Sequence, residues 1–133
     1  MMIGDSVLDL IGSTPMVRIN KLNTNKDIKV YAKLEGFNPT GSIKDRVALK
    51  MIEEAEKSGE LKPGKVIIEA TSGNTGIGLA MVGSQKGYKV VIVMSSSVSI
   101  ERRKMIRAFG AEVILTSPDL GTDGAIMKVQ EMI

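Results

Sequence analysis

The sequence contains no cysteine and no histidine among its 133 residues. This excludes disulfide bonds, cysteine nucleophiles, histidine-based acid–base catalysis and the zinc sites that proteins usually build from these two residue types. No metal site is expected. If the protein performs acid–base chemistry near neutral pH, the candidates are carboxyl groups with a raised pKa and lysines with a lowered pKa.

Tryptophan is also absent, and tyrosine and phenylalanine contribute two residues each. The 18 basic and 15 acidic residues are interleaved and leave a net charge of +3. Nucleic acid is therefore not an expected partner, because its recognition needs stacking rings or a concentrated basic surface. No apolar run approaches a membrane span, and the first residues lack the layout of a secretory signal. A membrane partner is not expected, and a cytoplasmic location is the default.

Short β-branched runs alternate with helical patterns from about residue 65 onward. The strand-like runs are VIIE (66–69), VVIVM (90–94) and EVILT (112–116). Helical patterns begin near Asn74 and near Ser99, and a last helical pattern runs to Ile133. This alternation is typical of a parallel sheet covered by helices. The predicted fold class is α/β, with three layers (α/β/α) and a mainly parallel sheet.

Residues 38–60, NPTGSIKDRVALKMIEEAEKSGE, open with turn residues and continue as a strong helical pattern. Ser42 followed by Asp45 predicts a near capping box at the helix start. At about 100° per residue, the apolar residues form one arc, which is the expected inner face, and the charged residues lie opposite. The arc contains Ile43, Val47, Ala48, Met51, Ile52 and Ala55, and the opposite side contains Arg46, Lys50, Glu53, Glu54 and Lys57.

Lys44 projects near the middle of this apolar arc. It also lies in the first helical turn, where the helix macrodipole disfavours a cation. Both effects favour the neutral amine, which is the nucleophile that Schiff-base chemistry requires. The alternative is that Lys44 extends from the helix end into solvent.

A glycine-rich turn, ATSGNTGIGLAM (70–81), follows the first strand-like run and opens a helix. A strand, such a turn and a helix N-terminus together can bind an anion, either a carboxylate or a phosphate. The alternative is a tight turn in which glycine serves close packing. The glycine order differs from G-x-G-x-x-G, so NAD is not expected. The hydrogen-bonding side chains of the turn are Thr71, Ser72, Asn74 and Thr75.

Four segments carry a family resemblance: IGSTPMVRI (11–19), NPTGSIKDR (38–46), EATSGNTGIGLA (69–80) and SIERRKMIRAFGAEVILT (99–116). Together they resemble the cysteine synthase and cystathionine β-synthase family of fold-type II pyridoxal-phosphate enzymes. The likeness covers nearly the whole chain, and SIERRK looks more like cysteine synthases (O-acetylserine or O-phosphoserine sulfhydrylases).

The resemblance implies a role for each matched residue. Lys44 is the implied catalytic residue and covalent attachment point of pyridoxal 5′-phosphate, and Asn74 is implied to contact the cofactor ring. The implied substrate-carboxylate residues are Thr71, Ser72, Gly73, Asn74 and Thr75. The implied reaction is a β-replacement that makes cysteine from an activated serine (O-acetylserine or O-phosphoserine) and sulfide. A homodimer is also implied.

The resemblance further implies that the chain is an N-terminal portion. Residues 1–36 hold strands expected to pack on a second domain, and residues 37–133 form a small α/β domain that carries the lysine and the carboxylate loop. The apolar helical pattern reaches Ile133 without a cap signal, which favours a truncation. The resemblance implies that a portion without the family's second domain is inactive alone. The alternative is a non-catalytic binding or regulatory module that uses the glycine-rich loop to bind a small carboxylate or a partner.

Overall fold

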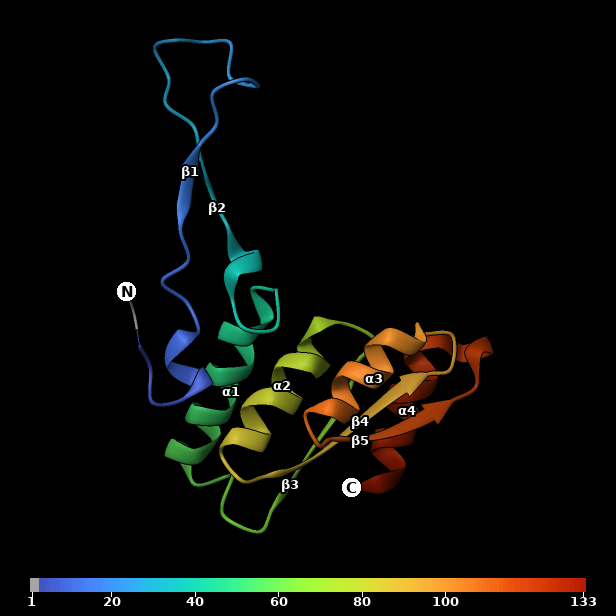
Figure 1. Cartoon of the computed structure of the whole chain (residues 1–133). Helices are drawn as coiled ribbons and strands as arrows, with labels where there is room; N and C mark the ends of the chain where they lie inside the picture. Colours follow the sequence, from blue (N-terminus) through green and yellow to red (C-terminus); the bar gives the residue numbers. More distant parts are fainter. Residues whose placement is uncertain (1–2) are drawn as a thin grey trace.

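The computed structural model describes residues 3–133 as an α/β body from which a β-hairpin projects (Figure 1). In chain order the elements are the 3₁₀ helix η1 (Val7–Leu10), β1 (Met16–Arg18), β2 (Tyr31–Lys33), the 3₁₀ helix η2 (Glu35–Phe37), α1 (Lys44–Ser58), β3 (Val66–Ala70), α2 (Asn74–Gln85), β4 (Lys89–Ser95), α3 (Ile100–Ala108), β5 (Glu112–Thr116), the 3₁₀ helix η3 (Pro118–Leu120) and α4 (Gly121–Met132).

The body is built on a parallel sheet with the strand order β3-β4-β5. Helix α2 connects β3 to β4, and α3 connects β4 to β5. Gly87 and Gly110, which precede β4 and β5, have φ of 79° and 85°. Glycine adopts these left-handed angles without the steric cost that a side chain brings, so both helices can end abruptly before the next strand.

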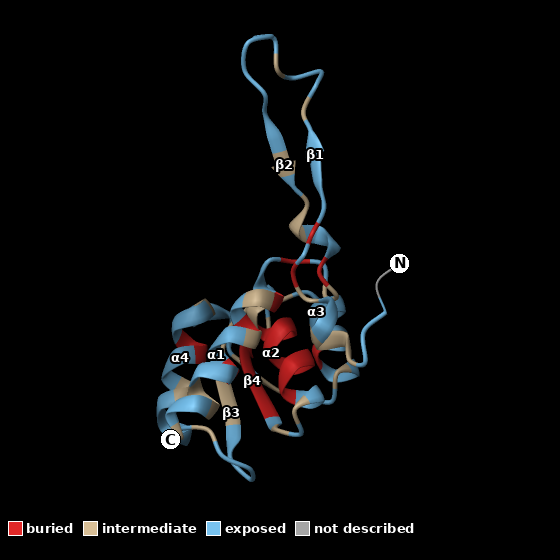
Figure 2. Ribbon diagram, turned by 90° about the vertical axis from the view of Figure 1, so that its left-hand side faces the viewer, coloured by how far each residue is buried: buried red, intermediate tan, exposed pale blue. Residues whose placement is uncertain are grey.

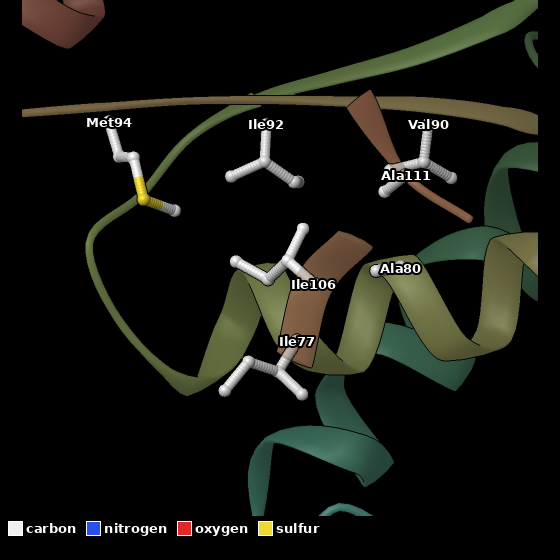
Figure 3. Packing of buried hydrophobic residues seen from close by; sticks show 7 residues of the cluster. All are labelled: Ile77, Ala80, Val90, Ile92, Met94, Ile106 and Ala111. Carbon is white, nitrogen blue, oxygen red and sulfur yellow. The ribbon is translucent and has the colours of Figure 1, made fainter. Parts of the chain in front are cut away.

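Helices cover both faces of the sheet. Side chains alternate between the two faces of a strand, and on one face Val90, Ile92 and Met94 of β4 pack against residues of α2 and α3 (Figure 3). On the other face, Val91 and Val93 pack against Ala125 of α4. The predicted fold class, three layers with a mainly parallel sheet, is confirmed.

Helix α1 lies outside α2 and contributes the second hydrophobic cluster. Ala48 and Ile52 are buried against Leu79, Met81 and Val82 of α2. The rest of the apolar arc is not covered, since the exposed fractions are 51% for Ile43, 39% for Val47 and 48% for Met51. The expectation that the whole arc faces inward is wrong, because α2 contacts only the side of α1 that carries Ala48 and Ile52.

Strands β1 and β2 form an antiparallel hairpin that extends away from the body and is largely exposed (Figure 2). The segment before it behaves differently, because Val7, Leu8 and Ile11 pack on the cluster between α1 and α2. The packing of residues 1–36 on a second domain stays a prediction. Within residues 3–133, none of the helices has both the length and the apolar character needed to cross a membrane.

Candidate functional site

The glycine-rich loop lies at the carboxyl edge of the parallel sheet. Strand β3 ends at Ala70, and the Thr71 N–H still donates to the Val93 carbonyl of β4 at 3.1 Å. Residues 71–75, which we call the anion loop, comprise the turn after β3 and the first two residues of α2. This edge is where open α/β sheets bind their ligands.

Three backbone N–H groups of the anion loop have no acceptor within residues 3–133: those of Ser72, Asn74 and Thr75. The first N–H groups of a helix lack partners in the preceding turn, and they carry the positive end of the macrodipole. The Thr71, Ser72 and Thr75 side chains are half-buried beside them, and Asn74 is exposed. The structure therefore brings the predicted carboxylate-binding residues together, with donors suited to an anion.

Two glycines of α2 allow close approach around the loop. A Cβ on Gly76 would lie 2.8 Å from Thr71 Cγ2 and 3.2 Å from Ile92 Cγ2. A Cβ on Gly78 would lie 3.1 Å from both the Lys44 carbonyl oxygen and Ala48 Cβ. Glycine at these positions lets the loop pack on the sheet and lets α1 pack on α2.

Lys44 is the first residue of α1, and its side chain is exposed. Helices α1 and α2 run parallel, since Lys44 adjoins Gly78 at one end and Glu56 bonds Lys86 at the other. Gly78 is four residues, or about 6 Å along the axis, after Asn74. The N-termini of both helices therefore open on the same side of the molecule, with Lys44 one helical turn from the start of α2.

The predicted capping box before α1 is not formed. Ser42 does accept a hydrogen bond from the Lys44 N–H, at 3.1 Å. The Asp45 carboxylate, however, turns back to the preceding loop and accepts from the Thr40 N–H at 2.7 Å and from the Thr40 hydroxyl. Asp45 is fully buried, so its carboxylate holds the loop that leads to Lys44 instead of capping the helix.

Buried polar residues concentrate around this loop. Of the five buried polar or charged residues found in the described part of the chain, four lie here: Thr14, Asn38, Ser42 and Asp45. Asn38 Oδ1 accepts from the Gly12 N–H at 2.9 Å, and its amide nitrogen donates to Glu35 Oε2 at 2.9 Å. Buried polar groups that are fully bonded fix one arrangement of the chain, because unpaired alternatives are costly.

An ion pair completes this network. Arg46 Nε donates to Glu35 Oε2 at 2.9 Å, and Arg46 Nη2 donates to Glu35 Oε1 at 3.1 Å. Thr14 contacts both partners: its hydroxyl donates to Glu35 Oε1 and accepts from Arg46 Nη2. Two-pronged guanidinium–carboxylate pairs are among the stronger and more directional contacts in proteins. This pair joins the base of the hairpin to the first turn of α1.

The Glu35 carboxyl should give the protein a characteristic acid sensitivity. The hydrogen bond from Arg46, followed by that from Asn38, lowers the pKa of Glu35 from 4.5 to about 2. A lowered pKa stabilises the folded state above the unfolded-state value, and this stabilisation is lost as the pH falls toward about 2. In urea titrations between pH 4.5 and 2, the free energy of unfolding should therefore fall less steeply for Glu35→Gln than for the unchanged chain.

Arg46→Gln provides the matched variant, because it removes the principal donor and leaves the carboxyl in place. Its stability curve should flatten in the same pH window. Equal slopes for all three proteins would show that the ion pair does not couple folding to protonation.

The sequence pattern missed several residues of this network. Arg46 was expected on the solvent side of the helix, and this is wrong, because it is half-buried against Glu35. Glu35 itself carried no signal, since its partners Arg46 and Thr14 lie 11 and 21 positions away in the chain. Arg102 was also not identified, although its Nη1 donates to the Ser72 carbonyl of the anion loop at 3.1 Å. In the sequence, the available sign of this polar network was the adjacent acidic and basic pair Asp45 and Arg46 within KDR (44–46).

Comparison with known proteins agrees with this fold. A family model described as pyridoxal-phosphate dependent enzyme matches residues 7–133. Cysteine synthase of Aquifex aeolicus is 52% identical over 132 residues, which make up 97% of this chain and 40% of that protein. The crystal structure of cysteine synthase from Entamoeba histolytica matches with a TM-score of 0.93 at 46% identity, over 99% of this chain and 40% of that one. A hydrogen sulfide-producing enzyme from Fusobacterium nucleatum matches with a TM-score of 0.91 at 54% identity, over 99% and 43%.

Fold and site together define an α/β protein in which the first residue of one helix, Lys44, packs beside a second helix that begins at a glycine-rich loop. The chain belongs to the family of pyridoxal-phosphate-dependent enzymes. The family resemblance predicted from the sequence motifs is thereby confirmed. The chain spans about 40% of the length of the curated relatives it matches.

Proposed function

We propose that this chain is the N-terminal part of a cysteine synthase, which makes cysteine from an activated serine and sulfide. The observation that carries the proposal is the packing of Lys44 on Gly78, one helical turn from the start of α2, where three N–H groups lack acceptors. The names of the relatives, cysteine synthases at about half identity, support the same activity.

The residues present fit pyridoxal phosphate and its amino-acid substrate. The exposed Lys44 amine is accessible to an aldehyde, and Asn74 at the first position of α2 offers an amide to the cofactor ring. When bound, the cofactor supplies an electron sink for the charge that develops when the substrate's α-proton is removed. Lys44 Nζ would hold the cofactor and then accept this proton.

The anion loop would bind the α-carboxylate of the amino acid. The N–H groups of Ser72, Asn74 and Thr75 and the hydroxyls of Thr71, Ser72 and Thr75 provide the donors, and Gly73 keeps the backbone accessible. A carboxylate fixed at this helix N-terminus would orient the α-carbon toward Lys44. The β-substituent of the substrate leaves, and sulfide takes its place.

The activity is proposed for the whole protein and not for these 133 residues alone. The relatives are more than twice as long, and we propose that their further parts bind the cofactor phosphate and the leaving group. We also propose that the exposed hairpin packs on such a second domain and that the protein acts as a dimer in the cytoplasm. The donor can be O-acetylserine or O-phosphoserine.

A labelling experiment tests the proposal on the chain as it stands. Pyridoxal phosphate is added, the adduct is reduced with borohydride, and the modified residue is mapped by mass spectrometry. The label is expected on Lys44 and should be lost in Lys44→Ala. Lys57→Ala, an exposed lysine near the far end of α1, should keep the label. A label spread over surface lysines and unchanged in Lys44→Ala would contradict the proposal and favour a non-catalytic binding module.

A further inference from the structure

Two arginines in the first turn of α3 bind the loops at the carboxyl edge of the sheet. Arg103 donates from Nε to the Val98 carbonyl at 2.9 Å and from Nη2 to the Ser96 carbonyl, in the loop that follows β4. Arg102 donates from Nη1 to the Ser72 carbonyl at 3.1 Å, in the loop that follows β3. Within residues 3–133, Arg102 is the one side chain outside the anion loop that hydrogen-bonds to it.

The position of Arg102 is not explained by the stability of α3. The first turn of a helix disfavours cations, because the macrodipole is positive there. The side chain is exposed, so it contributes little buried apolar area. Its contact with Ser72 joins positions 30 residues apart.

The contact fixes one peptide plane of the anion loop at both ends. The Ser72 carbonyl accepts from Arg102, and the N–H of the same peptide, that of Gly73, donates to Thr71 Oγ1 at 3.3 Å. A peptide unit is planar, so holding both of its polar groups sets its orientation. This plane lies between the N–H groups of Ser72 and Asn74. The peptide joins Ser72 to Gly73, and a glycine has more backbone conformational freedom than other residues unless contacts of this kind restrict it.

We propose that Arg102 is a positioning residue that orients the anion loop for a substrate carboxylate. The inference rests on the proposed function, because it assumes that the loop binds a carboxylate. By holding the Ser72–Gly73 peptide, Arg102 orients the flanking N–H groups of Ser72 and Asn74. It also adds a positive charge beside the site, which favours an anionic over an uncharged ligand group. Discrimination between an amino acid and its ester therefore depends on Arg102.

The first test uses backbone ¹⁵N relaxation on the cofactor-free chain. Order parameters for Ser72 to Thr75 are expected near 0.85 in the unchanged chain and in Arg107→Gln, a variant in the last turn of the same helix. In Arg102→Gln they should fall toward about 0.6. Arg102→Lys, which keeps the charge and a donor, should recover part of the loss. Unchanged order in Arg102→Gln would overturn the inference.

The second test separates positioning from a merely structural role. L-serine and L-serine methyl ester are titrated into each protein, and the amide shifts of the anion loop are followed. Arg102→Gln should weaken the binding of L-serine about fivefold and leave the binding of the ester unchanged. Arg107→Gln should alter the binding of neither ligand. Equal weakening of both ligands, or no weakening of L-serine, would overturn the inference.

The outcomes also separate this inference from the proposed function. Selective label on Lys44 together with no effect of Arg102→Gln would refute only the role of Arg102. No label on Lys44 together with discrimination of acid from ester that is lost in Arg102→Gln would refute the enzyme and leave Arg102 as the positioning residue of a carboxylate-binding loop. No binding of L-serine by the unchanged chain would overturn both carboxylate roles.

Discussion

Asp45→Ala is expected to lower the free energy of unfolding by about 3 kcal/mol. The Asp45 carboxylate is fully buried and accepts two hydrogen bonds from Thr40, one from its N–H and one from its hydroxyl. Hydrogen bonds to a charged acceptor are stronger than neutral ones, and the truncation leaves buried donors unpaired. The variant also removes a negative charge from the first turn of α1, where the macrodipole favours it.

Urea titration of Asp45→Ala against two controls measures this effect. Asp45→Asn keeps a carbonyl acceptor and should cost less than alanine, and Glu53→Ala, an exposed acid on the same helix, should change stability by less than about 0.5 kcal/mol. In the labelling experiment, Asp45→Ala should also reduce the yield on Lys44, because the loop that precedes the lysine is released. A loss of stability no larger than that of Glu53→Ala would show that the buried carboxylate does not hold this loop.

The strands and helices of the body could be predicted from the sequence because local signals determine them. The run EVILT was expected at 112–116, and β5 spans Glu112–Thr116. Helix α2 was expected from about Asn74 and begins there. In both regions, β-branched runs, helical periodicity and glycines at the boundaries agree with one another, and such agreement is what makes a prediction reliable.

The contacts of α1 could not be predicted in the same way. A helical pattern describes residues relative to the helix axis, but it does not say which neighbours surround the helix. Arg46 therefore looked solvent-facing, although the base of the hairpin supplies Glu35 as its partner. Conversely, Val47 and Met51 looked buried, and yet no element of the described chain covers them.

The candidate site was predicted as residues but not as geometry. Thr71, Ser72, Asn74 and Thr75 could be placed together because they are close in sequence, whereas their proximity to Lys44 depends on the contact between α1 and α2. From the sequence, Gly78 could be assigned only to a glycine-rich turn. The structure shows that Gly78 of α2 lies against the Lys44 carbonyl group of α1.

Gly78→Val should therefore affect both the fold and the site. A Cβ at this position would lie 3.1 Å from the Lys44 carbonyl oxygen and from Ala48 Cβ, and 3.3 Å from the Lys44 carbonyl carbon. None of these atoms can rotate away, so the two further methyl groups of valine must push α1 from α2. Overpacking of this kind costs about 2 to 3 kcal/mol. The displacement acts on the first turn of α1, which carries Lys44.

Ser84→Val is the matched control, because it places the same side chain on an exposed position of α2 and so measures the helix propensity of valine alone. Label yield on Lys44 is compared under conditions in which circular dichroism shows both variants folded. The yield should fall in Gly78→Val and remain unchanged in Ser84→Val. Equal stability and equal labelling of the two variants would mean that the α1–α2 contact does not place Lys44, and that the polar network around Asp45 and Arg46 alone holds the lysine beside the anion loop.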